Sequence, residues 1–293
     1  MEATFVSSFS PPKRLDSPAY WFVFQGWKML VLPQENERLV QVPLVKSLDE
    51  VGITAVLRQQ YHGYFESDSG QQTHCFSAEI DEDVALPEGG EAEGLRGLFP
   101  RLESQLFAVA GRSVQIMDWD RTHQYCARCG DPVQLQVGEP AKKCLSCGQT
   151  HYPRLSPAVI VAISRDGEQG REILLARNKR FPPGWYSVLA GFVEPGESLE
   201  QCVAREVFEE VGVREDILRY YSSKPWQFPH SLKIGFTADY VGGEFVLQEA
   251  EIDEAHWFRP DALPKIPPRI SIARQLIDAF VAENRAEAAG DGS

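Results

Sequence analysis

Short apolar runs separated by turn residues fill the first 118 residues of the chain. Two of these runs, 20–24 and 29–32, flank Gly26, and this arrangement predicts two strands joined by a turn. Residues 81–94 are acidic and rich in glycine, which predicts a loop. Apolar residues three and four positions apart predict a helix over 102–114. These patterns indicate a folded region, but they carry no evident chemistry.

Strand and helix patterns alternate over residues 157–280, which predicts an α/β domain. Residues 285–293 are rich in alanine and glycine, and we expect them to fray as a flexible tail. Strands are expected over 159–163, 172–176 and 236–240, and helices over 198–211 and 270–283.

The composition of the chain excludes several classes of protein. Its 293 residues suggest about two domains, and 43% apolar with 24% charged residues excludes global disorder. The net charge of −13 argues against indiscriminate binding of nucleic acid, although contact with a single RNA end stays open. No apolar run is as long as the ~18 residues of a membrane span, and the first ten residues lack the pattern of a secretory signal. We therefore expect a soluble, cytoplasmic protein.

Four cysteines form two pairs with the spacing of a metal site. Cys126 and Cys129 make one Cys-x-x-Cys pair, and Cys144 and Cys147 make another after 14 intervening residues (130–143). Two such turns can close a tetrahedron of thiolates around one structural Zn²⁺. Chance pairs or a redox dithiol are the alternatives, and the nearby His151 is surplus if all four sulfurs bind.

Other residues near or outside this cluster have simpler interpretations. Cys75 and Cys202 are isolated, and we interpret them as small buried apolar residues. Basic side chains around the cysteines suggest either a nucleic-acid surface or, for most of them, a solvated basic surface. They are Arg121, Arg128, Lys142 and Lys143.

The helix expected over 198–211 has clear limits. Ser198 followed by Gln201 forms a capping box, and Gly212 follows the last turn as a C-terminal stop. An apolar stripe along this helix can dock it on a sheet. It consists of Val203, Val207 and Val211.

Three carboxylates share another face of this helix. Glu206, Glu209 and Glu210 stand at i, i+3 and i+4, so their like charges destabilise the helix unless a cation neutralises them. Oxygen ligands at this density suit Mg²⁺ or Mn²⁺. Arg205 stands four residues before Glu209 and can hold part of the cluster. Taken alone, the cluster fits a solvated helix with ion pairs equally well.

The full pattern from Gly191 to Val213 is much more specific. It contains seven fixed identities, for which the probability of a chance match is roughly 10⁻⁸ per starting position. On this pattern the chain is identified as a member of the Nudix hydrolases. The resemblance implies an α/β/α sandwich that hydrolyses a nucleoside diphosphate linked to another group with a catalytic divalent cation.

The resemblance also implies roles for individual residues. Glu206 and Glu210 would be the principal ligands of Mg²⁺ or Mn²⁺, with Glu209 beside them. Arg205 would orient a carboxylate, and Glu210 is also a possible base. Further candidate ligands are the carbonyl of Ala190 and the side chain of Glu251.

A second string, over 223–232, concerns the substrate. Prolines stiffen it, so that Trp226 and Phe228 can be presented at little entropic cost. A proline-rich turn that places both rings in the core is the alternative. The string resembles Ser-Gln-Pro-Trp-Pro-Phe-Pro-x-Ser, the marker of the NADH pyrophosphatase branch of Nudix enzymes. It departs from the marker at Lys224 and Gln227, and Lys224 adds a charge that could favour a phosphate or an RNA end.

This resemblance implies the architecture of the whole chain. A small α+β N-terminal domain of the NADH pyrophosphatase type would cover 1–118, and a four-cysteine zinc ribbon would cover 119–154. The Nudix domain would cover 155–284, with the tail over 285–293. The implied substrate-binding residues are Arg96, Glu139, Tyr152, Ile160, Phe192, Lys224, Pro225, Trp226, Gln227, Phe228, Pro229, His230, Ser231 and Ala273. Phe192 and Ile160 would enclose the nicotinamide side, and Tyr152 would serve the pocket of a neighbouring subunit.

The expected activity is hydrolysis of the pyrophosphate of NAD(H) to NMN(H) and AMP. Removal of an NAD cap from RNA, which leaves a 5′-monophosphate, is implied as well. We expect a homodimer with one structural Zn²⁺ per subunit and no membrane partner. A Nudix hydrolase for ADP-ribose and a Nudix-fold sensor without catalysis are the alternatives.

Overall fold

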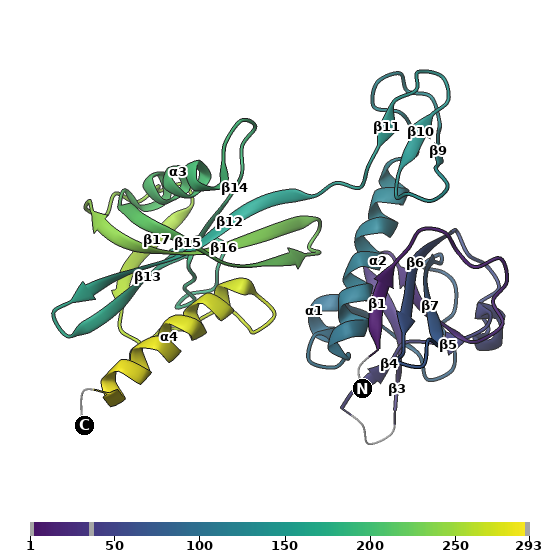
Figure 1. Cartoon of the computed structure of the whole chain (residues 1–293), viewed down its shortest axis with the longest axis horizontal. Coiled ribbons are helices and arrows are strands. Elements are labelled where there is room, and N and C mark those ends of the chain that lie inside the picture. The colour runs from purple at the N-terminus through teal and green to yellow at the C-terminus, as the bar shows by residue number, and fades with distance from the viewer. Residues whose placement is uncertain (1–2, 35–37, 291–293) are drawn as a thin grey trace. The chain divides into compact units, whose positions relative to one another are not determined.

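Two compact units divide the chain, with the boundary between Arg154 and Leu155. The computed structural model describes residues 3–34 and 38–290, and for 285–290 the description is limited to the backbone. Figure 1 shows a largely antiparallel sheet with a long helix in the first unit and a mixed sheet with two helices in the second.

The first unit is built on an eight-stranded sheet in the described part of the chain. Its strands follow the order β1-β6-β7-β2-β3-β4, with β5 paired to β2 and β8 paired to β3. The strands are β1 (Thr4–Ser7), β2 (Ala19–Gln25), β3 (Lys28–Pro33), β4 (Val40–Gln41), β5 (Leu44–Val45), β6 (Arg58–Glu66), β7 (Gln72–Glu79) and β8 (Glu91–Gly94).

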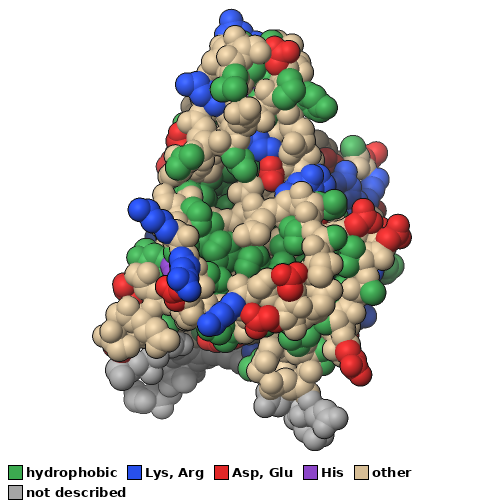
Figure 2. Space-filling model, turned by 90° about the vertical axis from the view of Figure 1, so that its right-hand side faces the viewer, with side chains coloured by type: hydrophobic (Ala, Val, Ile, Leu, Met, Phe, Trp, Pro, Cys, Tyr) green, Lys and Arg blue, Asp and Glu red, His purple; other side chains and the backbone are tan. Residues whose placement is uncertain are grey.

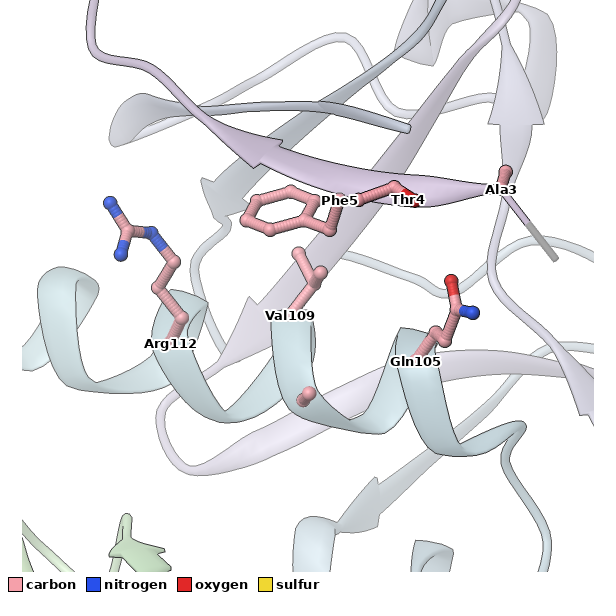
Figure 3. A pocket seen from close by; sticks show the side chains of 7 residues that line it. Ala3, Thr4, Phe5, Gln105, Val109 and Arg112 are labelled. Atoms are coloured by element: carbon pink, nitrogen blue, oxygen red, sulfur yellow. The ribbon is translucent and has the colours of Figure 1, made fainter. Parts of the chain in front are cut away.

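A long helix, α2 (Ser104–Thr122), packs against β6 and β7, after a short 3-10 helix (Leu48–Val51) and the single turn α1 (Leu95–Leu98). A pocket of about 550 Å³ lies between β1 and α2. Figure 3 shows Phe5 of β1 facing Val109 of α2 in this pocket, with Arg112 at one end and Gln105 at the other. The pocket lies at the edge of the sheet, since β1 is the outermost strand on that side.

The strands predicted around Gly26 are confirmed as β2 and β3, and Gly26 has a φ of +57°, which suits a residue without a Cβ. The prediction of a loop over 81–94 is wrong at its end. Residues 91–94 form β8, because an open edge of β3 offers hydrogen-bond partners that outweigh the low strand propensity of the sequence. The predicted helix over 102–114 begins two residues later and continues to Thr122.

A buried histidine makes the first unit sensitive to acid. His62 of β6 is fully buried, and its Nε2 lies 2.7 Å from the Oγ of Ser77 while Nδ1 has no partner. Burial, assisted by the charge of Arg112, lowers the pKa of His62 to about 3. Below about pH 6.5 the unfolded chain therefore binds a proton at His62 that the folded chain does not bind. The free energy of unfolding falls as the pH drops from about 6.5 toward 3.

We expect His62→Gln to flatten this pH dependence by up to about 1.4 kcal/mol per pH unit. Hydrogen exchange of β6 and β7 peptides across a urea series at pH 7 and pH 5.5 would measure it. His256→Gln is the matched control, because His256 is an exposed residue of β17 (Ile252–Phe258). An unchanged pH dependence in His62→Gln would contradict the assignment.

The last part of the first unit is a small three-stranded sheet in the order β11-β10-β9. Its strands are β9 (Val133–Leu135), β10 (Lys142–Cys144) and β11 (Thr150–His151). Lys142 is 2% exposed, which corrects its interpretation as a solvated basic residue. Its Nζ forms an ion pair with Asp120 and donates hydrogen bonds to the carbonyls of Asp120 (2.9 Å) and His123 (2.8 Å) at the end of α2. The lysine thus caps the negative end of that helix.

The second unit contains a six-stranded sheet in the order β15-β16-β12-β13-β17, with β14 paired to β12, among the described residues. Helix α3 (Leu199–Val211) and helix α4 (Ile272–Gly290) cover opposite faces of this sheet (Figure 1). The strands introduced here are β12 (Ser156–Gly167), β13 (Gly170–Asn178), β14 (Leu189–Phe192), β15 (Arg214–Trp226) and β16 (Ser231–Gly242).

Alternate residues of the central strand β12 feed the two cores. Val159 and Val161 pack with Val203 and Val207 of α3, whereas Ile160 packs with α4. This packing confirms the apolar stripe predicted for α3. It also confirms the α/β layers predicted from the alternating strand and helix patterns. The backbone of α4 is helical to Gly290, so the tail expected from residue 285 overlaps this helix, and 291–293 lie outside the described residues.

The surface of the first unit bears no broad basic stripe on the face shown in Figure 2, where Lys and Arg lie singly or in small groups among acidic and apolar side chains. This agrees with the acidic net charge. Among the described residues, none of the helices has the length and apolar character needed to cross a membrane.

Candidate active site

The helix α3 begins and ends where the sequence predicts. The Oγ of Ser198 accepts a hydrogen bond from the backbone N–H of Gln201, and the side-chain oxygen of Gln201 accepts one from the backbone N–H of Ser198. Gly212 has a φ of +78° and closes the last turn. Because both ends are fixed and Val203 and Val207 are buried, the carboxylates on the adjoining side of α3 have a defined direction.

Arg205 is the centre of the carboxylate cluster. Its guanidinium donates to both oxygens of Glu197 (2.6 and 2.9 Å), to Glu206 (2.9 Å) and to Glu209 (3.1 Å). It also donates to the carbonyl oxygen of Phe192 at 3.0 Å. A lysine could not make this fork of bonds. Arg205 therefore fastens the start of the helix, two of its carboxylates and the end of β14 to one another.

Glu206 lies flat against β14. A Cβ placed on Gly191 would come within 1.7 Å of the carboxyl carbon of Glu206, so only glycine allows this approach. Burial raises the pKa of Glu206, the nearby charges of Glu209 and Glu251 add to this, and the guanidinium of Arg205 opposes it.

Glu210 is the most constrained acid of the cluster. It is 5% exposed, and its Oε2 has no hydrogen-bond partner. Burial raises its pKa to about 8, the charges of Glu206 and Glu251 add to this, and a hydrogen bond with the backbone of Ala190 opposes it. An acid without a cationic partner in such surroundings is costly, and perturbed acids of this kind mark functional sites.

Glu251 reaches the same region from a separate loop. The backbone N–H of Gln248 donates to the carbonyl of Glu210 (3.0 Å), and the N–H of Lys179 donates to the carbonyl of Glu251 (2.8 Å). The first bond holds the loop beside the end of α3, and the second holds it beside the end of β13. The loop thus brings together acids that stand about 40 positions apart in the sequence.

The cluster fits a divalent cation. The charge of Glu251 adds to the raised pKa of both Glu206 and Glu210, and the unpartnered Oε2 of Glu210 is an oxygen donor that no residue satisfies. Hard oxygen donors of this kind are the ligands that Mg²⁺ and Mn²⁺ take. Glu209 is held by Arg205 and is half exposed, so it lies at the rim of the cluster.

The four cysteines form a tighter group. The ligand atoms of Cys126, Cys129, Cys144 and Cys147 all lie within 4.8 Å of one another, and this is the one such group among the described residues. His151, which the spacing left as surplus, has its Nε2 buried without a hydrogen-bond partner. Four sulfurs without an open position suit a structural Zn²⁺. Cys75 and Cys202 are both fully buried, as predicted.

The string expected to bind substrate forms the turn between β15 and β16. Trp226 ends β15 and Ser231 begins β16, and the two residues are cross-strand partners. Trp226 and Phe228 pack edge to face with ring centroids 5.1 Å apart, and the peptide bond between Phe228 and Pro229 is cis. Gln227 is buried, and the Nδ1 of His230 lies 3.1 Å from the Oγ of Ser156.

The other predicted substrate residues occupy different environments. Phe192 is 59% exposed at the end of β14. Ile160 and Ala273 are buried together between β12 and α4. Three more lie in the first unit, and Tyr152 is 60% exposed. These three are Arg96, Glu139 and Tyr152, and their roles stay predictions.

Two features of the cluster were missed by sequence reasoning. Glu197 belongs to the pattern from Gly191 to Val213, but it precedes the helix. The spacing of residues on the helix therefore did not predict that it is the main partner of Arg205. The bond from Arg205 to the carbonyl of Phe192 needs the position of β14, which no local pattern provides.

We expect Arg205→Lys to lower turnover by about 10- to 100-fold, because a single ammonium cannot hold Glu197, Glu206 and Glu209 together. The concentration of Mn²⁺ needed for half-maximal activity should rise as well. Steady-state kinetics with a Mn²⁺ titration would measure both, and Arg219→Lys is the control, since Arg219 forms an exposed ion pair with Asp239. Equal loss in both variants would show that the cluster does not depend on the fork.

Comparisons with known proteins cover all three parts of the chain. Family models match a NUDIX domain over 154–280, an NADH pyrophosphatase-like rudimentary NUDIX domain over 18–119, and an NADH pyrophosphatase zinc ribbon domain over 121–152. A relative from Stutzerimonas stutzeri named NAD-capped RNA hydrolase NudC is 47% identical over 227 residues, covering 78% of this chain and 79% of the relative. A relative of the same name from Chromobacterium violaceum is 41% identical over 260 residues, covering 89% of this chain and 91% of the relative.

Proposed function

Because this chain belongs to the Nudix hydrolases, in the branch with an NADH pyrophosphatase-like N-terminal domain and zinc ribbon, we propose that it hydrolyses the pyrophosphate of NAD(H). The products are NMN(H) and AMP. The same cut removes an NAD cap from RNA and leaves a 5′-monophosphate, since free and capped dinucleotide share the bond that breaks.

One observation of the structure supports this proposal above the others. The buried Glu210, with its unpartnered Oε2 and its raised pKa, lies beside Glu206 and Glu251 at the end of α3. This buried acid has no cationic partner, and of its two neighbours Glu206 is held by Arg205, so the charge of Glu210 costs folding free energy unless a cation neutralises it. Such an acid is what a site for a cation-bound pyrophosphate requires.

Different residues of the chain have different roles in the proposed reaction. Glu206, Glu209, Glu210 and Glu251, with the carbonyl of Ala190, would hold divalent cations, which supply charge neutralisation of the pyrophosphate and acidify water. Arg205 fixes the directions of Glu206 and Glu209. Oε2 of Glu210 is placed to accept a proton. One water adds across the P–O–P bond, so that one phosphate gains the hydroxyl and the other leaves with the bridging oxygen.

Several finer points belong to the same proposal. The catalytic cation is Mg²⁺ or Mn²⁺, because the donors are oxygens. The working form is a homodimer, and the exposed ring of Tyr152 would serve the partner's pocket. We place the protein in the cytoplasm, where both dinucleotides and RNA 5′ ends are present.

Product analysis with the purified protein tests the proposal. NADH, NAD⁺, ADP-ribose and NAD-capped RNA are offered side by side with Mg²⁺ or Mn²⁺, with and without chelator. We expect NMN(H) and AMP from the dinucleotides, 5′-monophosphate RNA from the capped RNA, and no product with chelator. Preference for ADP-ribose would support the rival hydrolase, and tight dinucleotide binding without any product would support a sensor.

A further inference from the structure

The pocket between β1 and α2 contains a single charged side chain, that of Arg112. Phe5 and Val109 form its walls. Residues 3–10 carry no charge, and Arg112 is the one charged residue of the helix between positions 104 and 117. No residue three or four positions away on the helix can therefore supply a carboxylate to Arg112. The pocket is thus an apolar space with a cation at one end.

Arg112 is held in place without an anionic partner. Its Nη2 donates to the Oγ of Ser7 at 2.9 Å, and its guanidinium carbon lies 4.8 Å from the centroid of the Phe9 ring. Its Nε is buried, and among the described residues this atom has no acceptor and the guanidinium has no carboxylate. Burial lowers the pKa of Arg112, because the charge loses hydration there. A guanidinium with donors to spare is a binding group for a phosphate or a carboxylate, whose oxygens match its fork.

The wall that β1 contributes is fixed against the rest of the sheet. Ser7 of β1 is paired with Gly63 of β6. Gly63 has a φ of +123°, and a Cβ on it would come within 2.0 Å of the carbonyl oxygen of Val6, so glycine is required for this close approach. The ring of Phe5 packs edge to face on Phe65, with ring centroids 5.3 Å apart. The apolar wall therefore has a defined position opposite α2.

An amide lies at the other end of the pocket. Figure 3 shows Gln105, Val109 and Arg112 rising from one side of α2 toward β1, as positions i, i+4 and i+7 of a helix do. The side-chain amide of Gln105 has no hydrogen-bond partner among the described residues. Seven helical residues place Gln105 about 10 Å from Arg112 along the axis. The pocket thus offers, in order, an amide that can donate and accept, an apolar wall and a cation.

We propose that this pocket binds a nucleoside monophosphate, with the phosphate on Arg112 and the edge of the base at Gln105. An extended nucleoside monophosphate has the length of the pocket, and about 550 Å³ lies within the roughly 300–1,000 Å³ of sites for small ligands. A glutamine amide matches the edge of adenine, which presents one donor and one acceptor, so AMP is the ligand that fits best. A fatty acid or an aromatic acid leaves the amide unused.

The nucleotide pocket is additional to the hydrolytic site. All of its lining residues belong to the first unit, whereas the carboxylates of α3 belong to the second. The proposal therefore does not depend on the proposed function.

Photolabelling of the full chain with azido-AMP, followed by mapping of the labelled peptides, tests this proposal. Without added Mg²⁺ or Mn²⁺, we expect label on peptides from 3–10 or 104–112, and AMP should compete for it. Arg112→Met should raise the AMP concentration needed for half-maximal competition about tenfold, because charge-assisted hydrogen bonds to the phosphate are lost. Arg14→Met is the matched control and should compete as the wild type does, since Arg14 forms an exposed ion pair with Asp16.

A second variant examines the other end of the pocket. Gln105→Leu should weaken competition by AMP about fivefold and leave competition by ribose 5-phosphate unchanged, because that fragment lacks the base. This variant keeps the test decisive if Arg112→Met loosens β1, since the amide of Gln105 supports no other described residue.

Two results would overturn the proposal. One is the absence of label from the first unit, and the other is competition by AMP that is equal in the wild type, Arg112→Met and Gln105→Leu. Because labelling needs no turnover, these results are separate from a failure to hydrolyse NADH, which would overturn the proposed function instead.

Discussion

Glu210→Gln is expected to lower the turnover of NADH by about 10³-fold, or about 4 kcal/mol in the activation barrier. The substitution keeps the shape of the side chain but removes the buried oxygen anion that would hold the cation and accept a proton. Dinucleotide binding should persist, because the hairpin of Trp226 and Phe228 is untouched. Steady-state kinetics and equilibrium binding in the presence of Mn²⁺ would measure the two effects, with the exposed Glu244→Gln as control.

A stability measurement on Glu210→Gln tests whether the loss of turnover results from misfolding. In the folded chain without cation the pKa of Glu210 is about 8, above its unfolded value, so the folded state binds the extra proton. Stability of the metal-free protein should therefore decrease as the pH rises from about 4.5 toward 8. Glu210→Gln should remove this decrease and be no less stable than the wild type at pH 8. Normal turnover in a folded Glu210→Gln protein would refute the assignment of the cation site.

Cys144→Ser is expected to abolish zinc binding and to unfold residues 126–151. The segment has a small sheet of three short strands, so most of its folding free energy comes from the metal, about 10 kcal/mol or more in comparable sites. One zinc ion per chain should be released from the wild-type protein by a thiol reagent, and none from the variant. Protection of β10 from hydrogen exchange should be lost.

The effect of Cys144→Ser should extend into α2. Unfolding of β10 withdraws Lys142 from Asp120, which is 5% exposed, and leaves that carboxylate without its ammonium partner. Asp120 then keeps Arg58 (3.8 Å) and the amide of Gln60 (3.0 Å) but not the ammonium, so the end of α2 loses stability. Hydrogen exchange of peptides from 104–122 should therefore accelerate as well. Retained zinc, or an α2 helix that is as protected as in the wild type, would contradict this coupling.

The local patterns that predicted the site share one property. Each depends on interactions between residues that lie only a few positions apart in the sequence. The cap at Ser198, the stop at Gly212 and the common face of Glu206, Glu209 and Glu210 all depend on helix geometry alone. The strands around Gly26 depend on a turn, and the four cysteines on two tight loops. The sequence therefore predicts these elements together with their limits.

The features that could not be predicted depend on partners distant in the sequence. Lys142 looks like a surface residue until the carbonyls at the end of α2 are brought against it. The opposition of Lys224 and Lys233 depends on register shifts in β15, which move the pairing after Tyr220. β8 forms because β3 leaves an edge open, although its own sequence is that of a loop.

The position of β15 at the border of its sheet has a consequence for the diversification of this enzyme. The hairpin that carries Trp226, Lys224 and Lys233 forms one edge of the sheet. Glu206 and Glu210 instead project from α3, which packs against the central strands. Substitutions in this hairpin need not move α3, which is held on the sheet by Val203 and Val207. Changes in nucleotide preference can thus be confined to the hairpin of β15 and β16, residues 214–242.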